Sequence, residues 1–215
     1  MKKSFRFDYE AHYSLSHEPT FQEKEIWLVL HGYGQLAEFF LRKFGRFFST
    51  DRLFIAPEGT NYTYLEGFQG RVGANWMTRH EQETAIENNH RFLDSLLDSV
   101  LSGYVTPPPI HVLGFSQGAA TAARWASRWK GEIRTLVLWA GGFALDLSLE
   151  NTRTKFQNTT VILALGDRDE MITSESIQKQ EELIVQLKKE VIRVSYSGGH
   201  ELDSDVLEKI INHQL

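Results

Sequence analysis

The stretch Ile110-His111-Val112-Leu113-Gly114-Phe115-Ser116-Gln117-Gly118 decides the fold expected for this chain. Its first part is an apolar run typical of a buried strand, and an alanine-rich segment of helical composition follows at 119–129. Gly114 to Gly118 matches the pattern G-x-S-x-G, in which a sharp turn joins a strand to a helix. Glycine at both ends leaves room for neighbouring backbone, while the turn strains the serine. The pattern predicts that Ser116 stands above a sheet, at the positive end of a helix.

On both sides of this turn, short β-branched or aliphatic runs alternate with longer segments of helical periodicity. Such alternation predicts βαβ units, and therefore an α/β fold with a mostly parallel sheet and helices on both faces. Residues 4–15 alternate between apolar and polar, which predicts antiparallel pairing at the N-terminal edge of the sheet. The predicted strands are 26–30, 53–56, 110–115, 135–139, 160–165 and 191–196, and the predicted helices are 86–101, 119–129, 174–189 and 204–213.

Composition limits the class of protein. The chain has 215 residues, a net charge of −5 and no cysteine. The length predicts one domain over residues 1–215. The predicted strands, helices and motif loops leave no stretch for a separate cap domain. The lack of cysteine excludes a disulfide-stapled scaffold, a thiolate metal site and a cysteine nucleophile. The charge does not support binding of nucleic acid or of an anionic membrane. With no apolar signal segment, we expect a soluble, cytoplasmic protein that does not insert into a membrane.

A serine hydroxyl is a poor nucleophile at neutral pH and needs a base within hydrogen-bond reach. In enzymes built on this turn, the base is a histidine that follows the serine in the chain. Of the eight histidines, only His200 and His213 do so. His213 lies in the last predicted helix, where a solvated terminal histidine is the simpler interpretation. His200 follows a strand and two glycines, in a loop at the carboxyl end of the sheet, and is therefore the predicted base.

The acid that orients this histidine is expected in the loop after the strand 160–165. Asp167 and Asp169 compete there. Asp167 follows a glycine and could close the turn through its own side chain, whereas Asp169 lies further along the loop, where it can point back into the site. We favour Asp169, with Asp167 and Asp146 as the alternatives.

Stabilisation of a developing oxyanion requires two backbone N–H donors. The residue after the nucleophile, Gln117, supplies one, and the loop after an early strand supplies the second. Here the sequence Leu30-His31-Gly32-Tyr33-Gly34 follows such a strand, and its glycines allow the backbone to turn its N–H groups toward a negative charge. We assign the second donor to Tyr33. His31 precedes the serine and is expected to hold the loop through hydrogen bonds.

Taken together, the loops LHGYG, GFSQG, GDRDE and SGGH resemble the phospholipase/carboxylesterase family of α/β-hydrolases, which includes bacterial carboxylesterases and acyl-protein thioesterases. The resemblance runs from about Glu25 to the last residue. It implies an α/β-hydrolase fold and hydrolysis of carboxylic esters or thioesters through an acyl-enzyme, without cofactor or metal. Carried over by position, it implies Ser116 as nucleophile, Asp169 as acid, His200 as base, and Tyr33 and Gln117 as oxyanion donors.

The chain departs from the family pattern at three places. Gln35 stands where an acidic residue is frequent, and Thr173 stands where a proline is frequent. The segment 73–77 also differs from the pattern associated with acyl-protein thioesterases. These departures leave the proposed triad intact but weaken the transfer of that particular substrate.

The segment 58–79 shows no clear periodicity and is rich in aromatic residues. A connection of this length is typically functional or mobile, and it is the only candidate cover for an otherwise open site. One hypothesis is that its aromatic side chains wall an acyl or aromatic pocket; the alternative is a loop pinned to the surface by aromatic packing. The residues concerned are Tyr62, Tyr64, Leu65, Phe68 and Trp76.

The expected partner is a small-molecule or acyl ester substrate. A second hypothesis is a lysophospholipase or lipase that prefers long acyl chains, and a third is a non-catalytic ligand binder on the same fold. The sequence leaves open whether the protein is a monomer or a homodimer, which ester or thioester it cleaves, and whether residues 58–79 form a mobile lid.

Overall fold

A central sheet of seven strands carries the molecule, in the order β1-β3-β2-β6-β7-β8-β9. The computed structural model describes residues 1–215. Strand β1 pairs antiparallel with β3, and every other neighbouring pair is parallel. The strands are β1 (Tyr13–Leu15), β2 (Glu25–Leu30), β3 (Arg52–Pro57), β6 (Ile110–Phe115), β7 (Thr135–Trp139), β8 (Thr160–Gly166) and β9 (Val191–Tyr196).

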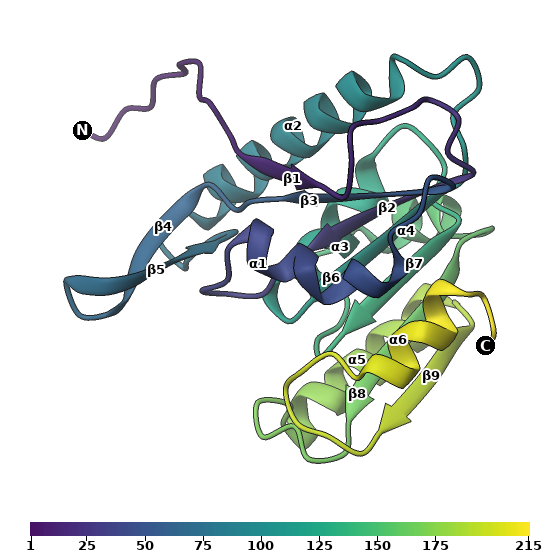
Figure 1. Ribbon diagram of the computed structural model, residues 1–215. Helices are drawn as coiled ribbons and strands as arrows, with labels where there is room; N and C mark the ends of the chain where they lie inside the picture. The colour runs from purple at the N-terminus through teal and green to yellow at the C-terminus, as the bar shows by residue number, and fades with distance from the viewer.

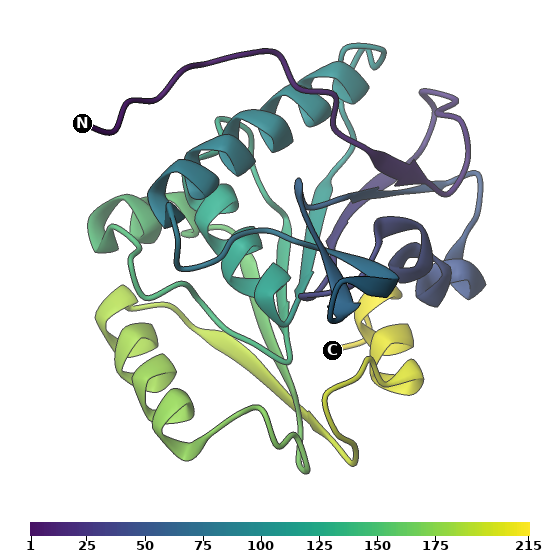
Figure 2. The same ribbon diagram turned by 90° about the vertical axis from the view of Figure 1, so that its left-hand side faces the viewer.

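Helices cover both faces of this sheet, as Figure 2 shows in a view along its edge. The layer on one face consists of α2 (Gln82–Leu101), α3 (Gln117–Arg128), α4 (Leu149–Lys155) and α5 (Ser174–Leu187). The layer on the other face consists of α1 (Ala37–Leu41), the 3₁₀ helix η1 (Arg42–Phe47) and α6 (Ser204–Ile211). The central strands are apolar at nearly every position because both of their faces are covered. The mostly parallel α/β sheet predicted from the sequence is confirmed.

The antiparallel N-terminal edge predicted from the sequence is confirmed, but it is shorter than expected. Of residues 4–15, only Tyr13–Leu15 forms the antiparallel edge strand; the preceding residues lie outside any helix or strand, and Phe5 and Phe7 are exposed. Alternation alone is a weak signal where nothing covers the apolar side chains.

The segment 58–79, expected to be irregular, contains an antiparallel hairpin of β4 (Asn61–Glu66) and β5 (Gln69–Asn75). The hairpin projects from the body of the molecule (Figure 1). The hairpin was not predicted because β4 and the first half of β5 are largely exposed on both faces. Their sequence therefore shows no alternation of apolar and polar residues.

The remaining elements follow ordinary local rules. Helix α6 begins after Asp203, whose carboxylate accepts hydrogen bonds from the backbone N–H groups of Asp205 and Val206, as expected of an N-cap. The short helices α1, η1 and α4 were not predicted, because a helix of one or two turns carries little periodicity. None of the helices combines the length and the apolar character needed to cross a membrane.

Candidate active site

Ser116 occupies the turn between β6 and α3, at the carboxyl edge of the sheet. Its backbone has φ 55° and ψ −118°, a strained conformation for a residue with a side chain. Its N–H donates to the carbonyl of Trp139 in β7 at 2.8 Å, which attaches the turn to the neighbouring strand. A Cβ at Gly118 would lie 2.4 Å from the carbonyl oxygen of Leu30. Only glycine therefore allows α3 to start this close to β2.

Three side chains form a hydrogen-bonded series at this edge. The Ser116 Oγ lies 2.8 Å from His200 Nε2, and His200 Nδ1 lies 2.8 Å from Asp169 Oδ2. The Asp169 side chain is fully buried, whereas the imidazole keeps 21% of its surface exposed. A hydroxyl, an imidazole and a buried carboxylate in this order can move the hydroxyl proton to the ring and stabilise the imidazolium that results.

The three candidate acids have different hydrogen-bond or ion-pair partners. Asp169 uses its second oxygen to accept from the N–H of Met171 at 3.0 Å, which fixes its orientation toward His200. Asp167 instead accepts from the N–H of Gly198 at 3.0 Å, and so joins the acid loop to the histidine loop. Asp146 pairs with Arg124 at 2.8 Å. The structure thus brings Asp169 to the histidine and gives the two alternatives other partners.

Aromatic residues hold the histidine loop. The hydroxyl of Tyr196, the last residue of β9, donates to the carbonyl of Glu201 at 2.6 Å. The indole N–H of Trp139 donates to the same carbonyl at 2.8 Å and to the Tyr196 hydroxyl at 2.9 Å. Burial raises the pKa of Tyr196, so it stays a neutral donor. The ring of Phe115 lies 5.1 Å from that of His200, centre to centre. Tyr196 and Trp139 therefore hold the backbone of the histidine loop, and Phe115 lies against the imidazole ring.

Two backbone N–H groups beside Ser116 have no acceptor within the protein. One belongs to Gln117, at the first position of α3, and the other to Tyr33, in the loop after β2. The β2 loop lies against the turn, because a Cβ at Gly32 would come 2.9 Å from the ring of Phe115. Free N–H donors next to a nucleophile are the components of an oxyanion hole.

The β2 loop is held by its own side chains. The His31 Nδ1 donates to the carbonyl of Gly32 at 2.7 Å, and its Nε2 accepts from the N–H of Gly59 at 3.0 Å. Burial lowers the pKa of His31, which keeps the ring neutral and able to accept. The Gln35 side-chain oxygen accepts from the N–H of Gly32 at 2.8 Å, so the amide provides the acceptor that a carboxylate would provide there. The expectation that His31 holds this loop is confirmed.

The hairpin is attached to the same loop by backbone hydrogen bonds. The N–H of Gly34 donates to the carbonyl of Ala74 at 2.8 Å, and the N–H of Ala74 donates to the carbonyl of Gln35 at 3.2 Å. A Cβ at Gly73 would lie 2.3 Å from the carbonyl oxygen of Gly34, so this contact requires glycine. We call this attachment, Gly34 and Gln35 against Gly73 and Ala74, the hairpin latch.

The side chain of Gln117 provides a second attachment that sequence reasoning missed. Its oxygen accepts from the N–H of Trp76 at 2.9 Å, and its nitrogen donates to the carbonyl of Met77 at 2.8 Å. The carbonyl of Trp76 in turn accepts from the Asn89 amide at 2.8 Å. The partners lie about forty residues apart in sequence, so no local pattern could have indicated this clamp.

The predicted pocket wall requires one correction. Trp76 is completely buried, stacks on His31 at 5.0 Å and donates its indole N–H to the carbonyl of His31 at 2.8 Å. It therefore supports the β2 loop from beneath and is not part of an accessible wall. The other residues lie on the hairpin. The Tyr62 hydroxyl donates to Glu58 at 2.9 Å, Tyr64 is half exposed, and Phe68 lies exposed at the tip.

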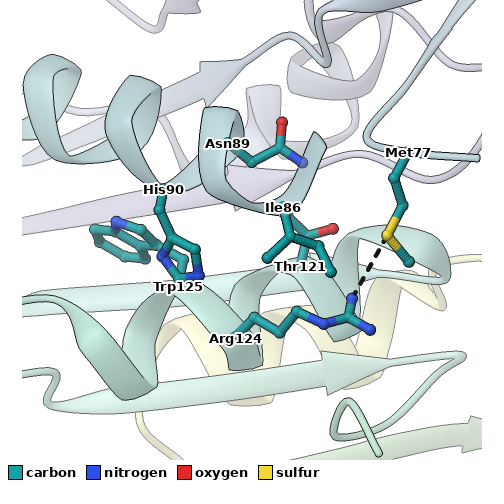
Figure 3. A pocket seen from close by; sticks show the side chains of 7 residues that line it. All are labelled: Met77, Ile86, Asn89, His90, Thr121, Arg124 and Trp125. Carbon is teal, nitrogen blue, oxygen red and sulfur yellow. Dashed lines mark hydrogen bonds between the residues drawn. The ribbon is translucent and has the colours of Figure 1, made fainter. Parts of the chain in front are cut away.

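A small pocket lies between α2 and α3, next to the exit of the hairpin (Figure 3). It contains none of the three residues of the hydrogen-bonded series. Burial lowers the pKa of His90 in its wall to about 4, so this imidazole is neutral at pH 7. Figure 3 shows Arg124 opposite Met77. The lining residues are Met77, Ile86, Asn89, His90, Thr121, Arg124 and Trp125.

Known proteins share the fold of this chain. The model of the phospholipase/carboxylesterase family matches residues 14–214. No curated protein sequence matches the chain. Among solved structures, Zea mays acyl-protein thioesterase 2 superposes with a TM-score of 0.72 at 17% identity, over 95% of this chain and 98% of that chain.

Two bacterial structures give similar values. A phospholipase/carboxylesterase from Dyadobacter fermentans superposes with a TM-score of 0.71 at 19% identity, over 96% of this chain and 97% of that chain. A Bacillus cereus carboxylesterase superposes with a TM-score of 0.68 at 16% identity, over 94% of this chain and 92% of that chain. At such identities the likeness establishes the shared fold, that of the α/β-hydrolases.

Proposed function

This chain belongs to the phospholipase/carboxylesterase family and is a carboxylesterase-type hydrolase, and we propose that it cleaves carboxylic esters or thioesters with Ser116 as its nucleophile. The single observation that carries the proposal is the series from Ser116 through His200 to Asp169, with both contacts at 2.8 Å. The series lies at the carboxyl edge of the parallel sheet, the place where α/β folds bind their ligands.

In the proposed mechanism, the hydroxyl of Ser116 attacks the substrate carbonyl while His200 accepts its proton at Nε2. The imidazolium then protonates the leaving alcohol or thiol, which leaves an acyl group on Ser116. Asp169 accepts the hydrogen bond from Nδ1 throughout and holds the ring in the tautomer that presents a basic Nε2. A water molecule repeats the sequence on the acyl-enzyme, and the acid product departs.

We assign the oxyanion hole to the backbone N–H groups of Tyr33 and Gln117. Both are free of protein acceptors and flank the turn that carries Ser116. Donors of this kind stabilise the negative charge only as it develops on the substrate oxygen, and each contributes about a hundredfold to a thousandfold in rate.

The hairpin favours an apolar acyl group over a charged one. Leu65 lies at an irregularity in the pairing of β4 and packs against the hairpin latch. A Cβ added at Gly34 would lie 3.0 Å from the Leu65 side chain. Tyr64, Phe68 and Val72 expose further apolar surface on the same hairpin. This apolar surface favours the second candidate function, that of a lysophospholipase acting on long acyl chains.

The proposal is tested with a fluorophosphonate probe and a series of p-nitrophenyl esters of increasing chain length. We expect the probe to label the wild type and not Ser116→Ala, and kcat to fall by roughly 10⁶-fold in that variant, as for other nucleophilic serines. Circular dichroism establishes that the variant is folded. Labelling that persists in Ser116→Ala contradicts the assignment. An optimum at long chains supports the lysophospholipase alternative.

A further inference from the structure

Three potential metal ligands meet at the end of the sheet opposite to Ser116. Glu25 opens β2, His111 is the second residue of β6, and His213 follows α6. One donor atom of each side chain lies within 4.8 Å of the other two. His111 and Ser116 are five residues apart on one extended strand, so the cluster lies roughly 16 Å from the catalytic serine. The cluster is therefore separate from the proposed active site.

The three donor atoms lie close enough together to meet at one small divalent ion after a small movement of His213. Glu25 Oε2 lies 3.4 Å from His111 Nε2 and 2.9 Å from His213 Nε2. With bonds of about 2.0–2.2 Å, neighbouring donors around tetrahedral zinc lie about 3.3–3.6 Å apart. The His111 side chain is buried and that of His213 is half exposed, so the first is held in place while the second can adjust to a metal.

The surrounding residues orient these donors. His111 Nδ1 lies 3.0 Å from the Thr135 hydroxyl. When this nitrogen donates its hydrogen to Thr135, Nε2 keeps its lone pair and faces Glu25. The guanidinium of Arg52 is hydrogen-bonded to the other oxygen of Glu25. Trp27 stacks on His111 at 4.7 Å and fixes the plane of that ring. Such outer contacts are typical of protein metal sites.

We propose that Glu25, His111 and His213 form a binding site for a divalent transition-metal ion, Zn²⁺, that joins the segment after α6 to the amino ends of β2 and β6. Two imidazoles and one carboxylate are a donor set suited to zinc, and the exposed side of His213 leaves a fourth position for water. The cation Arg52 beside Glu25 weakens the attraction, so we expect affinity in the micromolar range. The sequence predicts no metal, because the expected hydrolysis needs none; the three ligands proposed here are distant in the chain.

Isothermal titration of tag-free, chelator-treated protein with ZnCl₂ tests the proposal. We expect one Zn²⁺ ion per chain, and a rise in Tm of about 5–10 °C at a zinc concentration a hundred times Kd. His213→Asn should weaken binding at least about tenfold, since loss of even an outer contact has that effect. His213→Asn also removes the hydrogen bond from His213 to Glu25, which changes Tm even without zinc. The quantity to compare between variants is therefore the change in Tm that zinc produces.

His200→Asn is the matched control, because the triad histidine is the competing place for zinc on this chain. The site proposed here predicts that His200→Asn binds zinc as the wild type does. Unchanged affinity in His213→Asn, or affinity lost in His200→Asn, overturns the proposal. Thr135→Val keeps the three donors and removes the outer contact, and it should weaken binding by about tenfold. It serves as the second variant because His111 is too deeply buried to replace safely.

Discussion

The proposed active site has an acid–base half and an oxyanion half, and the two are held by different means. Asp169 and His200 lie on loops that leave the neighbouring strands β8 and β9 directly, and the acid and histidine loops bond to each other through Asp167 and Gly198. The oxyanion half depends on a hairpin outside the main sheet, which is joined to the β2 loop by the hairpin latch and to α3 by Gln117. The first half is continuous with the central sheet, whereas the second depends on a hairpin attached to the outside of that sheet.

The two halves should therefore respond differently to substitution. The acid and histidine loops are continuous with paired strands of the central sheet and move only if the sheet moves. Substitutions in these loops should therefore act through the chemistry that is lost. A hairpin attached by a few hydrogen bonds can shift without unfolding the protein, so the oxyanion half should lose activity in steps while global stability changes little.

The largest effect is expected from the acid. Asp169→Asn retains the size of the side chain but reverses the hydrogen bond to His200 Nδ1, which favours the wrong tautomer; kcat should fall about 10⁴-fold, as in other triads. Steady-state ester hydrolysis measures it. Asp167→Asn can still accept from the N–H of Gly198, so we expect kcat close to that of the wild type. Comparable losses in both variants would show that Asp169 has no special role.

The second effect concerns the hairpin latch. Gly73→Ala places a Cβ 2.3 Å from the carbonyl oxygen of Gly34, which should push the hairpin and the β2 loop apart. Displacing one oxyanion donor should lower kcat about a hundredfold or more, while Tm changes by only a few degrees. Arg71→Ala, at an exposed position of the same strand, is the control. Wild-type kcat in Gly73→Ala would mean that the hairpin does not position the donor.

A smaller effect is expected from the Gln117 clamp. Gln117→Ala keeps the backbone N–H assigned to the oxyanion hole but removes both side-chain bonds to the hairpin exit, and kcat should fall about tenfold, less than a full 1 Å misplacement would cause. Gln180→Ala removes a matching pair of bonds, at 2.8 and 2.9 Å, to the backbone of Phe143. If both variants lose kcat equally, the effect is general loosening and not oxyanion geometry.

The smallest effect concerns pH and His90, which lines the pocket between α2 and α3. Burial lowers the pKa of His90 to about 4, against about 6.5 in the unfolded chain. Between these values the unfolded state binds more protons, so the free energy of unfolding should decrease as the pH falls from 6.5 to 4, by roughly 2–3 kcal/mol for this residue. Urea unfolding at several pH values measures it.

His90→Gln should flatten that pH dependence, whereas His80→Gln, at an exposed position ahead of α2, should leave it unchanged. If the free energy of unfolding depends on pH equally in the wild type and in His90→Gln, His90 does not cause the dependence. The charged groups that face His90 are Arg124 and Arg128, which oppose its protonation, and Glu87 and Asp94, which favour it.

The amino-acid sequence by itself was enough to indicate the parallel sheet, the turn at Ser116 and the two loops that carry Asp169 and His200. Each of these features is local: an apolar run, a glycine pair or a short loop at the end of a strand determines its own conformation. Asp169 could be favoured over Asp167 because its position in one loop limits where the side chain can point.

Only the tertiary structure decided how the oxyanion half is held and where the metal ligands meet. The clamp of Gln117 on Trp76, the burial of Trp76 under His31, and the meeting of Glu25 with His111 and His213 join residues from 41 to 188 positions apart. Side-chain bonds to distant backbone leave no periodicity in the sequence. They exist because the order of strands in the sheet brings those segments side by side.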